Sequence, residues 1–324
     1  MLRLTELKLP LDHPEDDLRA ALLAHLGIGA DDLVAFSVYK RSYDARQKKN
    51  IQLIYTVDVT LRDGVEAAVS KRAIAHVAAS PDMTYRFVAQ APTHLKTRPL
   101  IIGFGPCGLF AALILAQMGY RPIVLERGKA VRERTKDTWG LWRGSVLNPE
   151  SNVQFGEGGA GTFSDGKLYS QIKDPQHYGR KVLEEFVAAG APEEILYVSK
   201  PHIGTFRLVS MIEKMRGDIE ARGGEIRFST RVEELLIEDR QVRGVRLANG
   251  EELRSDHVVL AVGHSARDTF QHLHDQGVHI EAKPFSIGFR IEHPQSLIDR
   301  ARFGEHAGHP LLGAADYKLV HHAR

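Results

Sequence analysis

A run of glycines after a short apolar segment is the clearest chemical signal in the sequence. Gly103-Phe104-Gly105-Pro106-Cys107-Gly108 follows three apolar residues, and the apolar stretch 109–118 comes next. The first glycine permits a tight turn, the second lets the backbone approach a pyrophosphate, and the last lets a helix pack closely on a strand. Free N–H groups at the start of that helix favour a phosphate. The spacing therefore predicts a dinucleotide site.

A carboxylate follows at the position that such a site requires. Residues 122–125 form a second predicted strand, and Glu126 lies 23 residues after Gly103. At this place an acidic side chain accepts hydrogen bonds from the adenosine ribose hydroxyls. Because strand, glycine turn, helix, second strand and acid occur in order, the pattern favours a dinucleotide fold over an ordinary turn. The motif alone does not distinguish NAD from FAD.

A second glycine-rich loop occupies residues 156–166 and includes Asp165. Successive backbone N–H groups in such a loop can form a nest for an anionic or electron-rich oxygen. Thr162 and Ser164 add hydroxyl groups that could contact the same ligand. A flexible surface loop is the alternative interpretation, because glycine is also common where nothing binds.

Short β-rich segments separated by turns follow this loop. We predict strands at 225–228, 232–237 and 241–247 and the start of another at 252–253, which together form a β-meander. An apolar strand is expected within 256–263. A simple NAD domain would instead continue with short βα repeats. The meander therefore favours FAD.

Several longer segments resemble one known family. They are GFGPCGLFAALILAQMG, VRERTKDTWGLW, NVQFGEGGAGTFSDGKL, KPHIGTFRLV, VVLAVGHSARDTF and KPFSIGFRIEHPQ, and they are spread over most of residues 98–324. They resemble the bacterial FAD-dependent dehydrogenase-like proteins, which have a glutathione-reductase-type FAD-binding fold and an N-terminal ferredoxin-like extension. The segments LKLPLDH and VYKRSYDARQKK resemble that extension. Val262 stands where the family usually has threonine, so a hydroxyl is lost.

The resemblance implies a set of cofactor-binding residues. Gly103, Gly105, Pro106 and Gly108 would hold the FAD pyrophosphate, Glu126 would bind ribose, the backbone of Val232 would lie near the adenine, and residues 158–162 would lie near the pyrophosphate or isoalloxazine. The full predicted set is Gly103, Gly105, Pro106, Cys107, Gly108, Glu126, Arg127, Gly158, Gly159, Ala160, Gly161, Thr162, Val232, Ala261 and Gly263. Family members continue into a strand ending in a Gly-Asp pair, which this sequence lacks, so we expect a C-terminally truncated chain.

The expected fold class is α/β, with a Rossmann-like FAD-binding domain that has a β-meander and follows a small ferredoxin-like α+β domain. Residues 1–95 show the order strand, helix, strand, strand, helix, strand, which is typical of a ferredoxin-like module. Its expected strands lie at 2–11, 33–43, 51–61 and 85–90, and its helices at 14–26 and 65–78. Residues 96–280 form the FAD-binding domain, and 281–324 begin a substrate domain.

Composition excludes several classes of protein. Lys and Arg number 43 against 41 Asp and Glu, so the net charge of +2 provides no strong field towards nucleic acid or anionic lipid. The single cysteine excludes an internal disulfide and a CxxC redox pair. We expect Cys107 to be a small packed residue rather than a redox thiol. No apolar run is long enough to span a membrane, and no signal peptide is evident, so we expect a cytoplasmic protein without a membrane partner.

Candidate catalytic residues remain open. His264, Ser265, Arg267 and Asp268 follow the last predicted strand, although Ser265 is equally suited to capping a helix. His202 and Arg207 are further candidates, and so are Arg290, Glu292 and His293, although the alternation of Phe285, Ile287, Phe289 and Ile291 predicts a strand. The irregular spacing of His272, His274 and His279 argues against a metal site.

We therefore expect an FAD-dependent oxidoreductase that acts on an unidentified small molecule by flavin hydride transfer. No second unit of strand, GxGxxG turn and helix is predicted, so NAD(P)H would dock only transiently as an electron donor. The alternative is a non-catalytic nucleotide- or RNA-binding protein that uses a basic hairpin with Tyr39 and Tyr43 between its cations: Lys40, Arg41, Arg46, Lys48 and Lys49. A third reading, an NAD-dependent dehydrogenase, is disfavoured by the meander.

Overall fold

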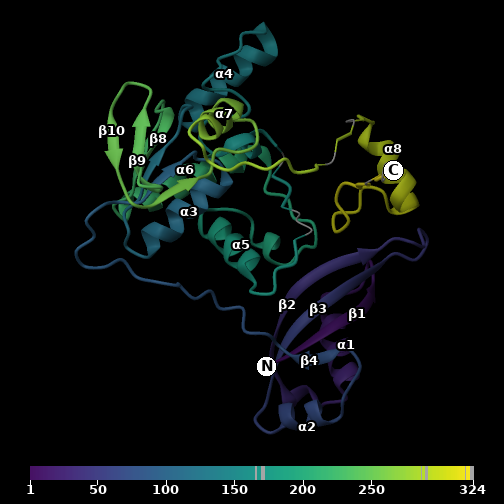
Figure 1. The fold of residues 1–324 in the computed structure, drawn as a ribbon. Coiled ribbons are helices and arrows are strands. Elements are labelled where there is room, and N and C mark those ends of the chain that lie inside the picture. Colours follow the sequence, from purple (N-terminus) through teal and green to yellow (C-terminus); the bar gives the residue numbers. More distant parts are fainter. Residues whose placement is uncertain (165, 169–171, 286, 289–290, 318, 322–324) are drawn as a thin grey trace. The chain divides into compact units, whose positions relative to one another are not determined.

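A computed structural model describes the chain except for residues 165, 169–171, 286, 289–290, 318 and 322–324 (Figure 1). The chain forms two compact units. Unit 1 comprises Met1–Asp82, Leu196–Ser199 and Pro284–Arg324, and unit 2 comprises Met83–Ile195 and Lys200–Lys283. The predicted domain boundaries at 95 and 280 stay predictions, but residues 284–324 group with the N-terminal unit.

Unit 1 contains a four-stranded antiparallel sheet in the order β2-β3-β1-β4. Its elements are β1 (Leu2–Pro10), α1 (Glu15–Leu26), η1 (Ala30–Asp32), β2 (Leu33–Asp44), β3 (Gln52–Leu61), α2 (Val65–Lys71), β4 (Val77–Ala79), α8 (Gln295–Phe303) and η4 (Gly304–His306). This strand order confirms the expected ferredoxin-like module. Leu22 and Leu26 of α1 are fully buried against the sheet, and Phe303 joins the same core.

Two expectations for this unit were wrong. The helix predicted over 65–78 ends at Lys71, because Ala73 and His76 adopt positive φ angles and the chain turns into β4. Residues 85–90 are not a strand. Tyr85 itself belongs to unit 2, where its half-buried ring packs edge-to-face against Tyr178, so its aromatic character reflects this ring contact and not strand pairing.

The strand expected over 285–291 is also absent from the described residues of that segment. The side chains of Phe285 and Ile287 are 84% and 86% exposed, so alternation here does not produce a buried face. Phe289 and the candidate Arg290 lie outside the described residues.

Unit 2 is built on a parallel sheet in the order β11-β5-β6-β7, with a separate antiparallel meander β10-β9-β8. Its elements are β5 (Leu100–Ile102), α3 (Pro106–Gln117), β6 (Ile123–Leu125), α4 (Val131–Gly144), η2 (Gly159–Phe163), α5 (Tyr178–Ala188), most of η3 (Glu193–Leu196), α6 (Thr205–Ala221), β7 (Glu225–Arg227), β8 (Val232–Glu238), β9 (Gln241–Leu247), β10 (Glu252–Arg254), β11 (Val258–Leu260) and α7 (Arg267–Asp275). The Rossmann-like α/β class with a meander is therefore confirmed.

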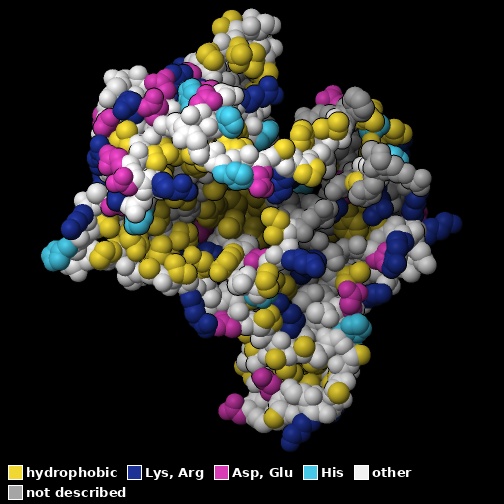
Figure 2. All heavy atoms as spheres, viewed as in Figure 1, with side chains coloured by type: hydrophobic (Ala, Val, Ile, Leu, Met, Phe, Trp, Pro, Cys, Tyr) yellow, Lys and Arg dark blue, Asp and Glu magenta, His cyan; other side chains and the backbone are white. Residues whose placement is uncertain are grey.

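Alternation along the short parallel strands divides unit 2 into layers. Ile101 and Val124 face a core formed with α3 and α6, whereas Ile102 and Leu125 face a core formed with the meander. The outer surface of the meander carries paired charges such as Arg246–Glu252 and Arg243–Asp256, and Figure 2 shows dark blue and magenta side chains intermixed there.

The meander is one strand shorter than the sequence suggested. Glu225–Arg227 pairs in parallel with β6 and completes the Rossmann sheet, and the meander begins only at Val232. The sequence of a three-residue strand is too short to indicate which sheet it will join. Its pairing is therefore determined by the strand that lies beside it in the folded chain.

Candidate functional site

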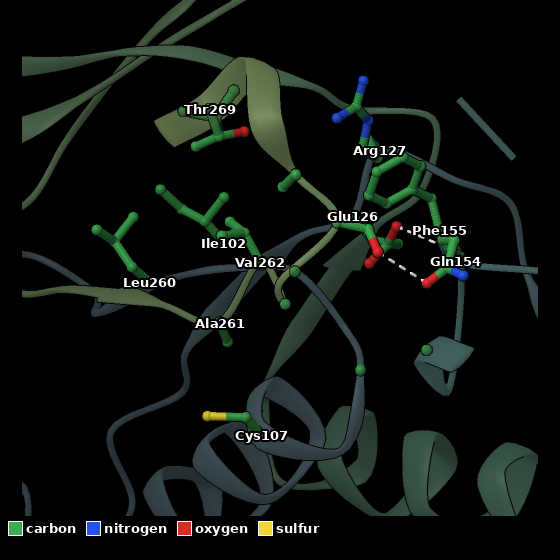
Figure 3. A pocket seen from close by; sticks show the side chains of 18 of the residues that line it. Ile102, Cys107, Glu126, Arg127, Gln154, Phe155, Leu260, Ala261, Val262 and Thr269 are labelled. Carbon is green, nitrogen blue, oxygen red and sulfur yellow. Dashed lines mark hydrogen bonds between the residues drawn. The ribbon is translucent and has the colours of Figure 1, made fainter. Parts of the chain in front are cut away.

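A cavity of about 540 Å³ lies at the carboxyl ends of β5, β6 and β11 (Figure 3). Ligands of open α/β sheets bind at this edge. Twelve of the fifteen predicted cofactor residues line the cavity: Gly103, Gly105, Pro106, Cys107, Glu126, Arg127, Gly159, Ala160, Gly161, Val232, Ala261 and Gly263. Gly108, Gly158 and Thr162 do not line it.

The first glycine motif is shaped by close backbone contacts. Gly103 has a φ of +96°, and a β-carbon there would lie 2.5 Å from the carbonyl oxygen of Ala261. A β-carbon on Gly108 would lie only 1.9 Å from the carbonyl oxygen of Gly103. Gly108 therefore serves helix packing, as its place in the motif predicts. Pro106 begins α3, where a missing N–H has no cost.

The second glycine loop packs directly over the first. A β-carbon on Gly159 would lie 2.9 Å from Cα of Gly105, so two glycines meet where the two loops cross. Gly158 is buried and instead contacts Thr162 and Ile212. The two loops together form one wall of the cavity.

The expected hydroxyl contacts from this loop were wrong. Thr162 is 2% exposed, and its Oγ1 donates to the carbonyl oxygen of Glu157 at 3.2 Å. Ser164 Oγ donates to the carbonyl oxygen of Gly161 at 2.7 Å. Both hydroxyls hold the loop together instead of facing the cavity. Asp165 lies outside the described residues.

Glu126 connects three segments through one carboxylate. Its Oε2 accepts the N–H of Phe104 at 2.6 Å, and its Oε1 accepts the N–H groups of Gly128 and Gly156 at 2.8 and 2.9 Å. The side chain is 4% exposed and still borders the cavity. A carboxylate has about four acceptor positions, so capacity for a ribose hydroxyl remains. The ribose contact itself stays a prediction.

Arg134 holds the second loop from beneath and was missed by the sequence analysis. It is fully buried on α4, and its guanidinium donates to the carbonyl oxygens of Asn152, Val153 and Glu157 at 2.6–2.8 Å. Burial lowers the pKa of Arg134 to about 10. A charge-rich helix such as residues 131–137 normally indicates a solvated face, so no sequence signal identifies this arginine as internal.

Arg127 links the cavity edge to two distant carboxylates. Its guanidinium pairs with Glu150 and with Asp268 of α7, both at 2.9 Å, and lies over the ring of Phe155. Burial tends to raise the pKa values of both carboxyls, but hydrogen bonds from Arg127 prevail and lower them. Arg127 therefore joins the end of β6 to the loop after α4 and to α7.

Comparison with known proteins places this arrangement in a family. Residues 96–271 match the family model described as an FAD binding domain. The chain belongs to the FAD-binding domain family. The match covers more than half of the chain, and it confirms the predicted resemblance and FAD as the cofactor.

Other similarities surround this FAD-binding domain. Residues 284–324 match a model for a C-terminal domain of FAD-dependent proteins, and residues 1–60 match a domain of unknown function. An uncharacterized protein of Clostridium beijerinckii is 40% identical over 320 residues, which is 99% of this chain and 59% of that protein. The chain thus spans about three fifths of this relative.

Solved structures match parts of this chain at low similarity. THI4 of Thermovibrio ammonificans is 20% identical, with a TM-score of 0.38, over 58% of this chain and 65% of that one. L-proline dehydrogenase from P. horikoshii is 14% identical, with a TM-score of 0.39, over 57% of each chain.

The residues of the cavity fit FAD. Gly103, Gly105 and Gly159 line it without side chains, and the first N–H groups of α3 are available to a pyrophosphate. Gln154 and Phe155 also line the cavity and were not predicted individually. In the sequence, only their position next to the second glycine loop indicated that they could lie near the cofactor.

The remaining candidates separate into two groups. His264 and Ser265 line the cavity, but Ser265 caps no helix and donates to Gln154 Oε1 at 2.9 Å. His202, Arg207 and Arg267 are exposed and do not line it. Glu292 and His293 belong to unit 1.

Cys107 is exposed at the cavity, so the expectation that it is a packed residue was wrong.

Two searches for other kinds of site found nothing among the described residues. No three His, Cys, Asp or Glu side chains are grouped so that they could hold a metal ion. Within the same part of the chain, no helix has the length and apolar character needed to cross a membrane.

Proposed function

We propose that this chain is the FAD-binding part of an oxidoreductase that acts on a small molecule. The observation that carries the proposal is the paired glycine cradle at the carboxyl edge of the Rossmann sheet, formed where Gly105 and Gly159 meet. The family match supports the same cofactor.

The protein's own residues would bind and orient the cofactor. The N-terminus of α3 would neutralise the pyrophosphate, Glu126 would accept from a ribose hydroxyl, and the backbone of Val232 would border the adenine. Arg127 and its carboxylate partners would keep α7 close to this end of the cavity. Bound FAD would supply the hydride-transfer chemistry.

A transient nicotinamide donor is part of the proposal. Residues 156–161 repeat the GxGxxG spacing, but they contribute to the wall of the FAD cavity and not to a separate nucleotide site. A donor would therefore bind only for the reductive step and then leave.

The RNA-binding alternative has weaker support. In the hairpin, Arg46 forms an ion pair with Asp44, and Tyr43 packs edge-to-face against Phe303 in the core of unit 1. A nucleic-acid footprint normally needs a strongly basic surface with accessible aromatic rings. Within the described part of unit 1, no observation favours RNA over solvent at this hairpin.

Flavin reduction tests the proposal directly. The purified chain is mixed with FAD, freed of excess, and examined for retained visible flavin bands. NADH, NADPH or dithionite is then added without oxygen. Bleaching by a nicotinamide and recovery on adding an acceptor support an oxidoreductase. Retained FAD that only dithionite reduces would leave the cofactor assignment intact and contradict the nicotinamide donor. Absence of retained FAD would contradict the assignment of the cradle.

A further inference from the structure

The end of α4 and the residues after it carry an exposed apolar patch outside the FAD cavity. Trp139 and Trp142 are 44% and 54% exposed, and Val146 and Leu147 are 68% and 59% exposed. We call these four residues the α4 tip. Helix α4 projects from the body of unit 2 in Figure 1, and Figure 2 shows hydrophobic side chains gathered at its end.

The aromatic side chains of the α4 tip are held in place by neighbours. The rings of Trp139 and Trp142 meet edge-to-face at 5.7 Å, and Trp142 meets Phe163 of η2 at 5.8 Å in the same way. The Arg143 guanidinium lies 4.2 Å from the centre of the Trp139 ring. Such packing restricts rotamers before any partner arrives, so binding would lose little side-chain entropy.

The size of the patch argues against a stable protein interface. A tryptophan buries at most about 250 Å². About half of that area is exposed on each ring, so the pair offers roughly 250 Å² in total. One side of a standard interface buries about 800 Å², which the tip does not reach even with Val146 and Leu147. A small projecting apolar tip instead matches shallow insertion into a lipid surface.

Charge and residue type point to the same partner. Arg143 is the only charged residue from Thr138 to Pro149, and Lys136 is exposed one turn before Trp139. The acidic Glu133 and Asp137 lie in the same earlier turns of the helix as Lys136, and Asp137 is neutralised by its ion pair with Lys129. Tryptophan prefers the boundary between headgroups and acyl chains, and nearby cations favour anionic lipid.

We propose that the α4 tip docks this protein peripherally on an anionic lipid surface, with Trp139 and Trp142 at the headgroup boundary. This departs from the sequence-based expectation of no membrane partner, which considered only spanning segments and net charge. The proposal is independent of the FAD chemistry.

Intrinsic fluorescence tests it without a label, because the chain's two tryptophans both lie in the tip. Vesicles of phosphatidylcholine alone, or mixed equally with phosphatidylglycerol, are added to the purified chain. We expect a blue shift in emission and co-sedimentation with the mixed vesicles. Phosphatidylcholine alone should bind about fivefold more weakly for each cation that faces the lipid.

Two variants distinguish binding through the α4 tip from non-specific adsorption to vesicles. Trp142→Ala should weaken binding on the order of a hundredfold, because the exposed half of the indole ring is no longer transferred from water to lipid. Phe206→Ala removes an aromatic ring that is 94% exposed on α6 and should leave vesicle binding unchanged. Equal losses in both variants would overturn the proposal. So would no binding to either vesicle, or a blue shift that follows protein concentration without lipid.

Discussion

Gly105 and Gly159 approach each other so closely that a β-carbon on Gly159 would lie 2.9 Å from the α-carbon of Gly105. They belong to two glycine loops separated by more than fifty residues, and both line the cavity. In the reverse direction, a β-carbon on Gly105 would lie 3.6 Å from the α-carbon of Gly159, which is an ordinary contact. Substitutions at the two positions therefore have different consequences.

Gly159→Ala should weaken both folding and FAD binding. The position has a φ of +62°, which costs an L-residue roughly 1–2 kcal/mol, and the new methyl group would press on Gly105. Urea unfolding and FAD titration would measure the two losses. Gly161→Ala is the matched control for the loss of stability, because no atom lies within 4 Å of its β-carbon. If both variants behave alike, the close approach of the loops has no importance.

Gly105→Ala should leave stability nearly unchanged and reduce FAD affinity. The methyl group fits the protein itself but occupies the space through which a pyrophosphate approaches the backbone. Gly105→Val should abolish binding. Gly108→Ala should behave oppositely and destabilise the fold, since its β-carbon would lie 1.9 Å from a carbonyl oxygen. Unchanged flavin content in purified Gly105→Val would refute the assignment of this loop.

Glu126→Ala should lower the free energy of unfolding as well as FAD affinity. Three backbone N–H groups lose a charged acceptor, and each such hydrogen bond contributes about 1.5–3 kcal/mol. Thermal unfolding without FAD isolates the structural part. Isothermal titration with FAD isolates the ribose contact at a temperature where the variant stays folded. An affinity within twofold of wild type would place the ribose contact elsewhere.

Arg134→Met should destabilise unit 2 by about 3 kcal/mol or more. It removes the charged donor from the carbonyl groups of Asn152, Val153 and Glu157, at roughly 1 kcal/mol or more each. Among the described residues, only Glu157 keeps a second donor, Thr162 Oγ1. Loosening the second glycine loop should also release FAD. Arg132→Gln, on the same helix but exposed and paired with Glu213, should leave the free energy of unfolding nearly unchanged. A stable Arg134→Met that retains FAD would disprove the role of Arg134.

The Arg127–Asp268 pair should make stability depend on acid. Because the pKa of Asp268 is lowered in the folded state, its contribution is present above the ordinary aspartate pKa and disappears as pH falls through the lowered value. Asp268→Asn should therefore be less stable than wild type at neutral pH and equal to it in strong acid. The difference should be below about 1 kcal/mol, since the carboxylate is 41% exposed. A difference independent of pH would exclude the ion pair as its source.

Local features of the fold could be predicted from the sequence. The glycine motif, the apolar helix after it, and the acid after the second strand depend on residues close together in the chain. Their spacing follows from the geometry of one turn, one helix and two adjacent strands. The same holds for the β2–β3 hairpin and for the turns of the meander.

Long-range pairing was decided only by the tertiary structure. Glu225–Arg227 has the composition of a meander strand but pairs with β6, about a hundred residues earlier. Phe303 completes the core of the N-terminal unit although it lies near the other end of the chain. The sequence of a short strand, or a single apolar residue, does not indicate which distant part of the chain will bury it.

The polar framework of the site also required the three-dimensional structure. The sequence by itself determined that Glu126 follows the second strand, and thus its place beside a dinucleotide. Tertiary structure decided that this carboxylate joins three backbone segments and that Arg134 is buried beneath a loop. A buried arginine is stable only where carbonyl groups accept its hydrogen bonds. Because folding brings those carbonyl groups together from separate parts of the chain, the local sequence does not indicate that the arginine is buried.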